Sequence, residues 1–169
     1  MNTSEFYKVN GATERNDSLI QIGKKNWLLV FGFFKDADME SGGNYRKNYD
    51  HKPSAEELRN DIEALINKVT DNAIANGFVW NGKSVYLSTE NQINFKAAYD
   101  LAVQSNGSTL PIKFKLGEEA DNTPVYHTFQ TLDEFTDFYT KAFAYISQCL
   151  NEGWTEKDNI DYQKLLDNE

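Results

Sequence analysis

Apolar side chains near the start of the chain gather in one short run instead of recurring at helical spacing. Residues 1–17 are polar, and we expect them to be poorly ordered unless a partner holds them. Ser18–Ile22 is typical of a short strand, and Trp27–Phe34 carries apolar residues on both faces. Because a half-exposed strand alternates apolar and polar residues, this run predicts a strand that needs cover on both faces. A polar loop over Lys35–Asn44 and a short strand over Tyr45–Tyr49 are expected to follow.

Three longer segments carry apolar residues at the spacing of an α-helix. The first opens after Pro53 with an S-x-x-E capping box formed by Ser54 and Glu57, and Gly77 is expected to end it at the C′ position. Its apolar stripe consists of Leu58, Ile62, Leu65, Ile66, Val69 and Ala73. This pattern predicts an amphipathic helix with one face on a core.

The other two long helices follow later in the chain. The second is expected between Ser88 and Gly107, and the third opens after Thr131 and is expected to stop at Gly153. One face of the second helix carries Ile93, Ala97 and Leu101, with Phe95 and Tyr99 nearby. A short final helix over Ile160–Leu166 follows an acidic start.

Two hairpins are expected between these helices. Phe78–Trp80 and Lys83–Leu87 flank Asn81-Gly82, a dipeptide that favours a two-residue turn because both turn positions need positive φ. Leu110–Leu116 alternates apolar and polar residues, and a polar loop joins it to Val125–Phe129. The chain therefore predicts an α+β fold in which small antiparallel hairpins pack with three main helices, preceded by an N-terminal aromatic β segment.

Composition and charge change most sharply near Pro53. We therefore expect a β-rich assembly segment over residues 1–52 and an α+β domain over residues 53–169. The first part carries 8 basic and 7 acidic residues, for a net charge of +1, and the second carries 9 and 19, for −10. An acidic body repels phosphate backbones and lacks a basic membrane-binding face, which argues against nucleic-acid binding and membrane insertion.

One stretch matches a pattern with known chemistry. Gly77–Ser84 fits G-x-x-x-x-G-K-[ST], the phosphate-binding loop. That loop needs a strand before it and a helix after it, whereas here a helix precedes Gly77 and β-prone residues follow Ser84. A hairpin explains every residue of the stretch. A nucleotide-binding enzyme that uses Lys83 and Ser84 is therefore the least favoured hypothesis.

An acidic loop is the one candidate cation site. Asp36, Asp38 and Glu40 alternate as calcium ligands do, but the sixth and twelfth positions of the loop hold Ser41 and Lys47 instead of Gly and Glu. We therefore favour a solvated loop, and a weak cation site in an irregular loop is left open.

The remaining reactive side chains are few. His51 and His127 are interpreted as surface or cross-strand imidazoles. Cys149, the single cysteine, lies on the apolar stripe of the third helix and is expected in the core. No catalytic residue, cofactor or metal site is predicted, so the chain is not expected to be an enzyme.

The ring-rich N-terminal part is the best functional lead. An apolar strand with no polar face is an aggregation hazard when it is left at an edge. Either the strand packs on its own body, or another subunit covers it with aromatic anchors at the interface, and the two alternatives weigh about equally. The candidate interface residues are Trp27, Phe31, Phe33, Phe34, Tyr45 and Tyr49.

The stretch Phe78–Asn94, with a W-x-G hairpin, a strand and a helix that opens with a polar residue and Gln, resembles a domain family of unknown function found in phage and prophage tail proteins. Leu110–Lys115, Tyr126–Phe129 and the third helix ending at Gly153-Trp154 look similar too. Upstream, Asn26–Asp36 is similar to N-terminal segments that accompany this domain in phages of gut bacteria. The resemblance covers roughly residues 26–157.

This resemblance implies a phage virion structural protein, tail or tail-fibre-associated, which acts through protein–protein assembly and is assembled in the host cytoplasm. The implied partners are other virion or tail proteins, or further copies of the same chain. The alternative is a tail-fibre assembly chaperone that is not retained in the virion. The family has no assigned catalytic residues, so the resemblance implies none here.

Overall fold

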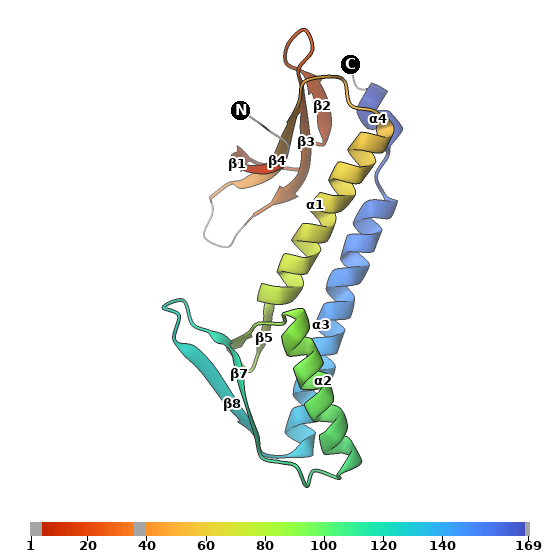
Figure 1. Ribbon diagram of the computed structural model, residues 1–169. Coiled ribbons are helices and arrows are strands. Elements are labelled where there is room, and N and C mark those ends of the chain that lie inside the picture. Colours follow the sequence, from red (N-terminus) through yellow and green to blue (C-terminus); the bar gives the residue numbers. More distant parts are fainter. Residues whose placement is uncertain (1–4, 36–39, 168–169) are drawn as a thin grey trace. The chain divides into compact units, whose positions relative to one another are not determined.

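The computed structural model describes residues 5–35 and 40–167, and it has an α+β fold, as predicted (Figure 1). The chain forms two compact units. Unit 1 comprises Met1–Ile66 and Lys157–Glu169, and unit 2 comprises Asn67–Glu156. No helix in the described part of the chain is long and apolar enough to cross a membrane.

Unit 1 is built on a four-stranded antiparallel sheet. The strands are β1 (Tyr7–Ala12), β2 (Ser18–Gln21), β3 (Trp27–Phe34) and β4 (Gly42–Tyr49), in the order β1-β4-β3-β2. The predicted apolar run is β3, and it lies inside the sheet between β2 and β4. The expectation of a poorly ordered start is wrong for β1, which pairs with β4 through its backbone.

Two helices supply apolar residues to the core of unit 1. They are the first half of α1 (Ala55–Asn76) and the short α4 (Tyr162–Asp167). Their buried side chains join those of the sheet in one cluster: Leu19, Trp27, Leu29, Phe31, Tyr49, Leu58, Ile62, Leu65, Ile66, Tyr162 and Leu165. The first turns of α1 therefore belong to unit 1, which extends to Ile66. The expected domain boundary near Pro53 stays a prediction.

Unit 2 contains two hairpins, one whole helix and parts of two others. The first hairpin joins β5 (Phe78–Trp80) to β6 (Lys83–Val85), and the second joins β7 (Ile112–Glu118) to β8 (Pro124–Phe129). The helices are the second half of α1, α2 (Thr89–Gln104) and most of α3 (Leu132–Asp158). The predicted turn is confirmed, since φ is 48° at Asn81 and 73° at Gly82.

The glycines expected to end helices behave differently from each other. Helix α1 does end before Gly77, but Gly77 does not have positive φ; a Cβ there would overlap Tyr145 Oη. The prediction that the third helix stops at Gly153 is wrong, because α3 continues to Asp158. Gly153 is buried and faces the side chain of Thr70 on α1, so it permits a close approach between two helices.

Aromatic rings fill the centre of unit 2. Phe129, Phe135 and Phe138 are fully buried, and the rings of Phe129 and Phe135 stack with centroids 4.4 Å apart. Trp80 closes the cluster and makes an edge contact with Phe138 at 5.3 Å. Cys149 is buried beside this cluster, which confirms its interpretation as a core residue.

The two hairpins of unit 2 are joined through an irregularity in β7. The register between β7 and β8 shifts between Lys115 and Gly117, and the carbonyl of Leu116 accepts a hydrogen bond from Tyr86 N at 2.7 Å. Gly117 allows this contact, since a Cβ there would lie 2.8 Å from the carbonyl oxygen of Ser84.

Candidate functional site

The structure divides the six predicted interface residues into two groups. Trp27, Phe31 and Tyr49 are buried in the core of unit 1. Phe33 is 37% exposed, and Phe34 and Tyr45 are half-buried with ring centroids 5.2 Å apart. The buried three pack on their own unit, so only Phe33, Phe34 and Tyr45 offer surface to a partner in this conformation. Whether they bind one stays a prediction.

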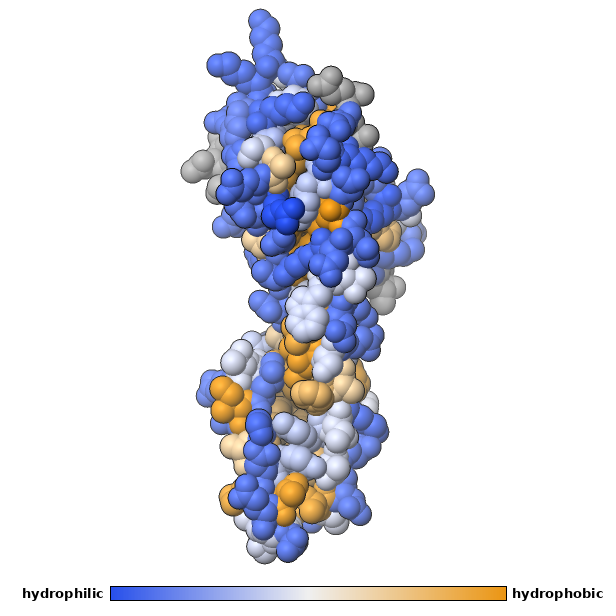
Figure 2. All heavy atoms as spheres, turned by 90° about the vertical axis from the view of Figure 1, so that its right-hand side faces the viewer, coloured by the Kyte–Doolittle hydropathy of each residue, from blue (hydrophilic) through white to orange (hydrophobic). Residues whose placement is uncertain are grey.

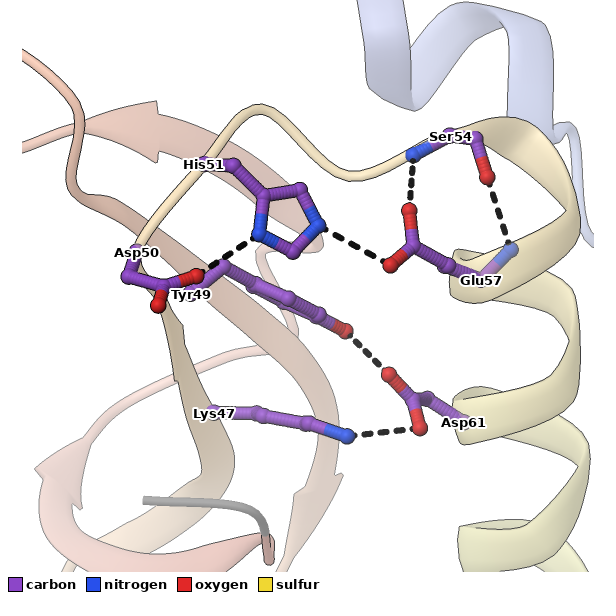
Figure 3. A network of polar contacts seen from close by, with 7 residues as sticks. All are labelled: Lys47, Tyr49, Asp50, His51, Ser54, Glu57 and Asp61. Atoms are coloured by element: carbon purple, nitrogen blue, oxygen red, sulfur yellow. Dashed lines mark hydrogen bonds and ion pairs between the residues drawn. The ribbon is translucent and has the colours of Figure 1, made fainter. Parts of the chain in front are cut away.

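A polar network joins β4 to the first turns of α1 (Figure 3). Lys47 Nζ lies 2.6 Å from Asp61 Oδ1, and the Tyr49 hydroxyl donates a 2.7 Å hydrogen bond to Asp61 Oδ2. Burial and the Asp61 carboxylate both raise the pKa of Tyr49, so the phenol stays protonated. Both oxygens of Asp61 are thus engaged, and the group holds the strand to the helix.

The start of α1 is held by an exposed imidazole (Figure 3). His51 Nδ1 lies 2.7 Å from Asp50 Oδ1, and Nε2 lies 2.9 Å from Glu57 Oε1. The other oxygen of Glu57 accepts from Ser54 N, and Ser54 Oγ accepts from Glu57 N, which confirms the predicted capping box. Hydrogen bonds to Asp50 and then Glu57 raise the pKa of His51 above its usual value.

A second polar row lies in unit 2. Lys83 Nζ is 2.9 Å from His127 Nδ1, and His127 Nε2 is 2.9 Å from Glu134 Oε1. A protonated lysine can only donate, so Nδ1 accepts and Nε2 carries the proton that is donated to Glu134. The imidazole also packs edge-on against Trp80. Lys83 on β6 therefore contacts a residue of the other hairpin, and the stretch that matches the phosphate-loop pattern forms the β5–β6 hairpin, with no helix beginning at Ser84.

A groove of about 690 Å³ lies in unit 2 where the end of α1, β6, the start of α2 and β7 meet. Its lining is mostly engaged with other parts of the protein. Lys115 and Glu118 form an ion pair, and Asn91 Nδ2 donates to the carbonyl of Tyr86 at 2.8 Å. Of the three charged residues that line the groove, Lys115 and Glu118 thus pair with each other, and Glu90 is the third.

The residues that the structure describes contain no cluster of three or more His, Cys, Asp or Glu side chains placed to hold a metal ion. Asp36 and Asp38, from the calcium-like pattern, lie outside those residues, and Glu40 is exposed.

Large apolar side chains reach the surface on two helices of unit 2. On α2, Ile93 is 63% exposed, Leu101 is 53% exposed, and Ala97 between them is exposed. On α3, Phe143 is 63% exposed and Trp154 is 55% exposed. Figure 2, which shows one side of the molecule, displays hydrophobic side chains at the surface among hydrophilic ones. Exposed apolar side chains that lie together, as Ile93, Ala97 and Leu101 do on α2, are candidates for contact with a partner protein.

The sequence showed that Ile93, Ala97 and Leu101 share a face, but it did not show which way that face points. The core contacts of α2 come instead from Phe95 and Ala102. The positions of the aromatic residues on α2 could have indicated the core side, since aromatic residues bury the largest areas and tend to face the core.

No curated protein and no solved structure shows significant similarity to the chain. Residues 57–169 match a family that is described as a domain of unknown function, DUF4376. The match begins in the first turns of α1 and includes all of unit 2, so it covers the Lys83–His127 row and the apolar faces of α2 and α3, while β1–β4 precede it. The chain belongs to the DUF4376 family.

Proposed function

We propose that the chain is a structural protein of a phage virion, associated with the tail or tail fibre, which acts through protein–protein assembly. The resemblance of residues 26–157 to tail-associated domains supports the phage context. The observation that carries the assembly role is the set of apolar side chains on α2 and α3 that are more than half exposed: Ile93, Leu101, Phe143 and Trp154.

These four side chains favour a protein partner over other partners. Interface cores are enriched in aromatic residues and depleted of charged ones, and Trp and Phe are effective anchors. The net charge of −9 opposes binding to nucleic acid. The charged lining of the groove in unit 2 consists of one lysine, which pairs with Glu118, and two carboxylates, so a small anion is a weaker candidate.

The test is made on particles purified by density gradient from cells that produce the phage. Mass spectrometry is expected to find the chain in the particles at a constant ratio to known tail proteins. If the chain is absent from particles but its deletion leaves them without fibres, the chaperone alternative replaces this proposal. If the particles lack the chain and its deletion leaves their assembly unchanged, both roles are refuted.

A pair of variants connects the test to the structure. Trp154→Gln removes an exposed ring on α3 and is expected to lower incorporation at least tenfold, as loss of an anchor does. Val79→Ser is the control, because Val79 is an apolar residue of similar exposure, 60%, that belongs to strand β5 and to neither α2 nor α3. Equal incorporation of the two variants would contradict a role for the α3 face.

A further inference from the structure

Helix α2 is apolar on two opposite faces. Phe95 and Ala102 are buried in the core of unit 2, whereas Ile93 and Leu101 are more than half exposed with Ala97 between them. Successive residues lie about 100° apart around a helix, so Ile93, Ala97 and Leu101 form one narrow stripe, and Phe95 lies on the other side. Polar residues, among them Asn94, Lys96 and Asp100, separate the two sides. The outer stripe is therefore a narrow apolar surface that the rest of the chain leaves uncovered.

We propose that this outer face binds the same face of a second copy of the chain, with the two α2 helices antiparallel about a twofold axis at Ala97. The inference deepens the proposed assembly role, on which it rests, by naming one partner. A twofold interface needs a surface that is complementary to itself. The stripe has this property: Ile93 would meet Leu101 of the second copy, and the two Ala97 methyl groups would meet at the axis.

The polar residues beside the stripe and at its two ends show the same complementarity. The twofold axis at Ala97 places Asn94 opposite Asp100 of the second copy and Glu90 opposite Gln104. In each pair a side-chain amide can donate to a carboxylate, and such charge-assisted hydrogen bonds are stronger than neutral ones. A parallel arrangement would instead place Glu90 beside Glu90 and Asp100 beside Asp100, which like charges disfavour. The sequence of α2 thus selects the antiparallel orientation.

The neighbouring lysine does not interfere with this arrangement. Lys96 Nζ contacts Asp100 Oδ2 at 2.6 Å on the same helix, which partly neutralises the carboxylate. Asp100 keeps its second oxygen for an amide of the second copy. Ala97 at the crossing point is small enough to let two helices approach to the usual interaxial distance of about 8–10 Å.

The expected contact is small. A 16-residue helix is about 24 Å long, and one helix pair buries less than the roughly 1,200 Å² that a stable interface needs. We therefore expect a dissociation constant of about 10–1,000 μM for the free chain. Within an assembly, the high local concentration of copies would saturate this contact.

Cysteine crosslinking tests the geometry on the full chain. Cys149 is buried and is replaced in a Cys149→Ala background. Ala97→Cys is expected to form a disulfide-linked dimer under mild oxidation, because residues at the twofold axis meet at crosslinking distance. Gln104→Cys is the matched control on the same helix, and it is expected to stay monomeric because the axis separates its two copies by about 20 Å. Crosslinking of both variants would overturn the antiparallel arrangement, and crosslinking of neither would overturn the contact.

Sedimentation velocity from micromolar to millimolar concentration gives the affinity. Ala97→Glu is expected to weaken self-association at least tenfold, and Val103→Glu, which lies off the stripe, is expected to leave it unchanged. Circular dichroism checks that both variants fold. A monomeric wild-type chain at millimolar concentration overturns the inference. If Ala97→Glu is monomeric but still enters particles at the wild-type ratio, this contact has no part in assembly, while the proposed virion role stands.

Discussion

Replacing Phe129 by alanine should remove the centre of the aromatic core of unit 2. Phe129 ends β8 and is 0% exposed. Its ring stacks on Phe135 at 4.4 Å and makes contacts with His127 at 4.7 Å and Phe138 at 5.0 Å. Deleting a buried phenyl ring costs about 3–5 kcal/mol from lost transfer energy and the cavity that remains. Against a usual total of about 5–15 kcal/mol, this is a large share of the stability.

Two further variants separate the loss of ring contacts from the loss of buried volume, and the effect of burial from the effect of removing a ring. Phe129→Leu keeps most of the volume but loses the ring pairs, each worth about 0.5–1.5 kcal/mol beyond area burial, so we expect a cost above about 1.5 kcal/mol but below that of Phe129→Ala. Phe143→Ala is the matched control, because the same atoms are removed from a side chain that is 63% exposed on α3. Its expected effect is within about 0.5 kcal/mol, as for most surface substitutions.

Urea unfolding followed by far-ultraviolet circular dichroism measures the three free energies. Because the chain has two compact units, the same transition is also followed by tryptophan fluorescence, and coincidence of the two curves decides whether one free energy applies. A Phe129→Ala variant within 1 kcal/mol of Phe143→Ala would refute the reasoning, because the two sites would then be equally tolerant of ring loss.

Three other outcomes can be measured. Gly77→Ala is expected to lower stability by about 1–3 kcal/mol, since the new methyl group overlaps Tyr145 Oη; thermal unfolding checks this. Gly82→Ala, with open space but a φ of 73°, is expected to cost about 1 kcal/mol in the same assay. Because folding raises the pKa of His51, protonated His51 should stabilise the folded state fully at pH values below its unfolded-state pKa, and this contribution should be lost as pH rises through its folded-state pKa. An NMR titration should show a lower pKa for His51 in the Asp50→Asn variant than in the wild type.

Local signals predicted the elements whose causes are local. The Asn81-Gly82 turn needs positive φ at two adjacent residues, and the structure has it. The Ser54–Glu57 capping box forms within four residues. The apolar run of β3 was predicted with its bounds, since continuous apolar residues suit a strand inside a sheet.

Features that depend on distant residues were not predictable. Gly153 looked like a helix stop, but its lack of a side chain is needed by Thr70, far away in sequence. Gly77 follows α1 at a point where Tyr145, which donates a hydrogen bond to Ala73 O from 72 residues away in sequence, leaves no room for a side chain. Strand β1 has no apolar alternation, because it is an edge strand with mostly exposed side chains and is held by backbone pairing.

The direction of the apolar stripe on α2 could not be read from periodicity for a different reason. A helical period shows which residues share a face, but on α2 both faces are apolar, so the period alone assigns neither to the core. The side that carries Phe95 and Tyr99 faces the core, because these larger aromatic rings bury more surface than Ile93 and Leu101. The smaller aliphatic stripe is then left outside.

The exposed apolar stripe of α2 and the acidic net charge of the chain together predict how self-association depends on salt concentration. An exposed apolar face is an aggregation hazard at high concentration. A net charge of −9 keeps free copies apart by repulsion, and this repulsion weakens as salt shortens the screening length. Self-association through Ala97 should therefore strengthen with ionic strength, whereas an interface held mainly by salt bridges would weaken. Measuring whether the affinity of self-association rises or falls with ionic strength therefore distinguishes an apolar α2 contact from one held by salt bridges, without any substitution.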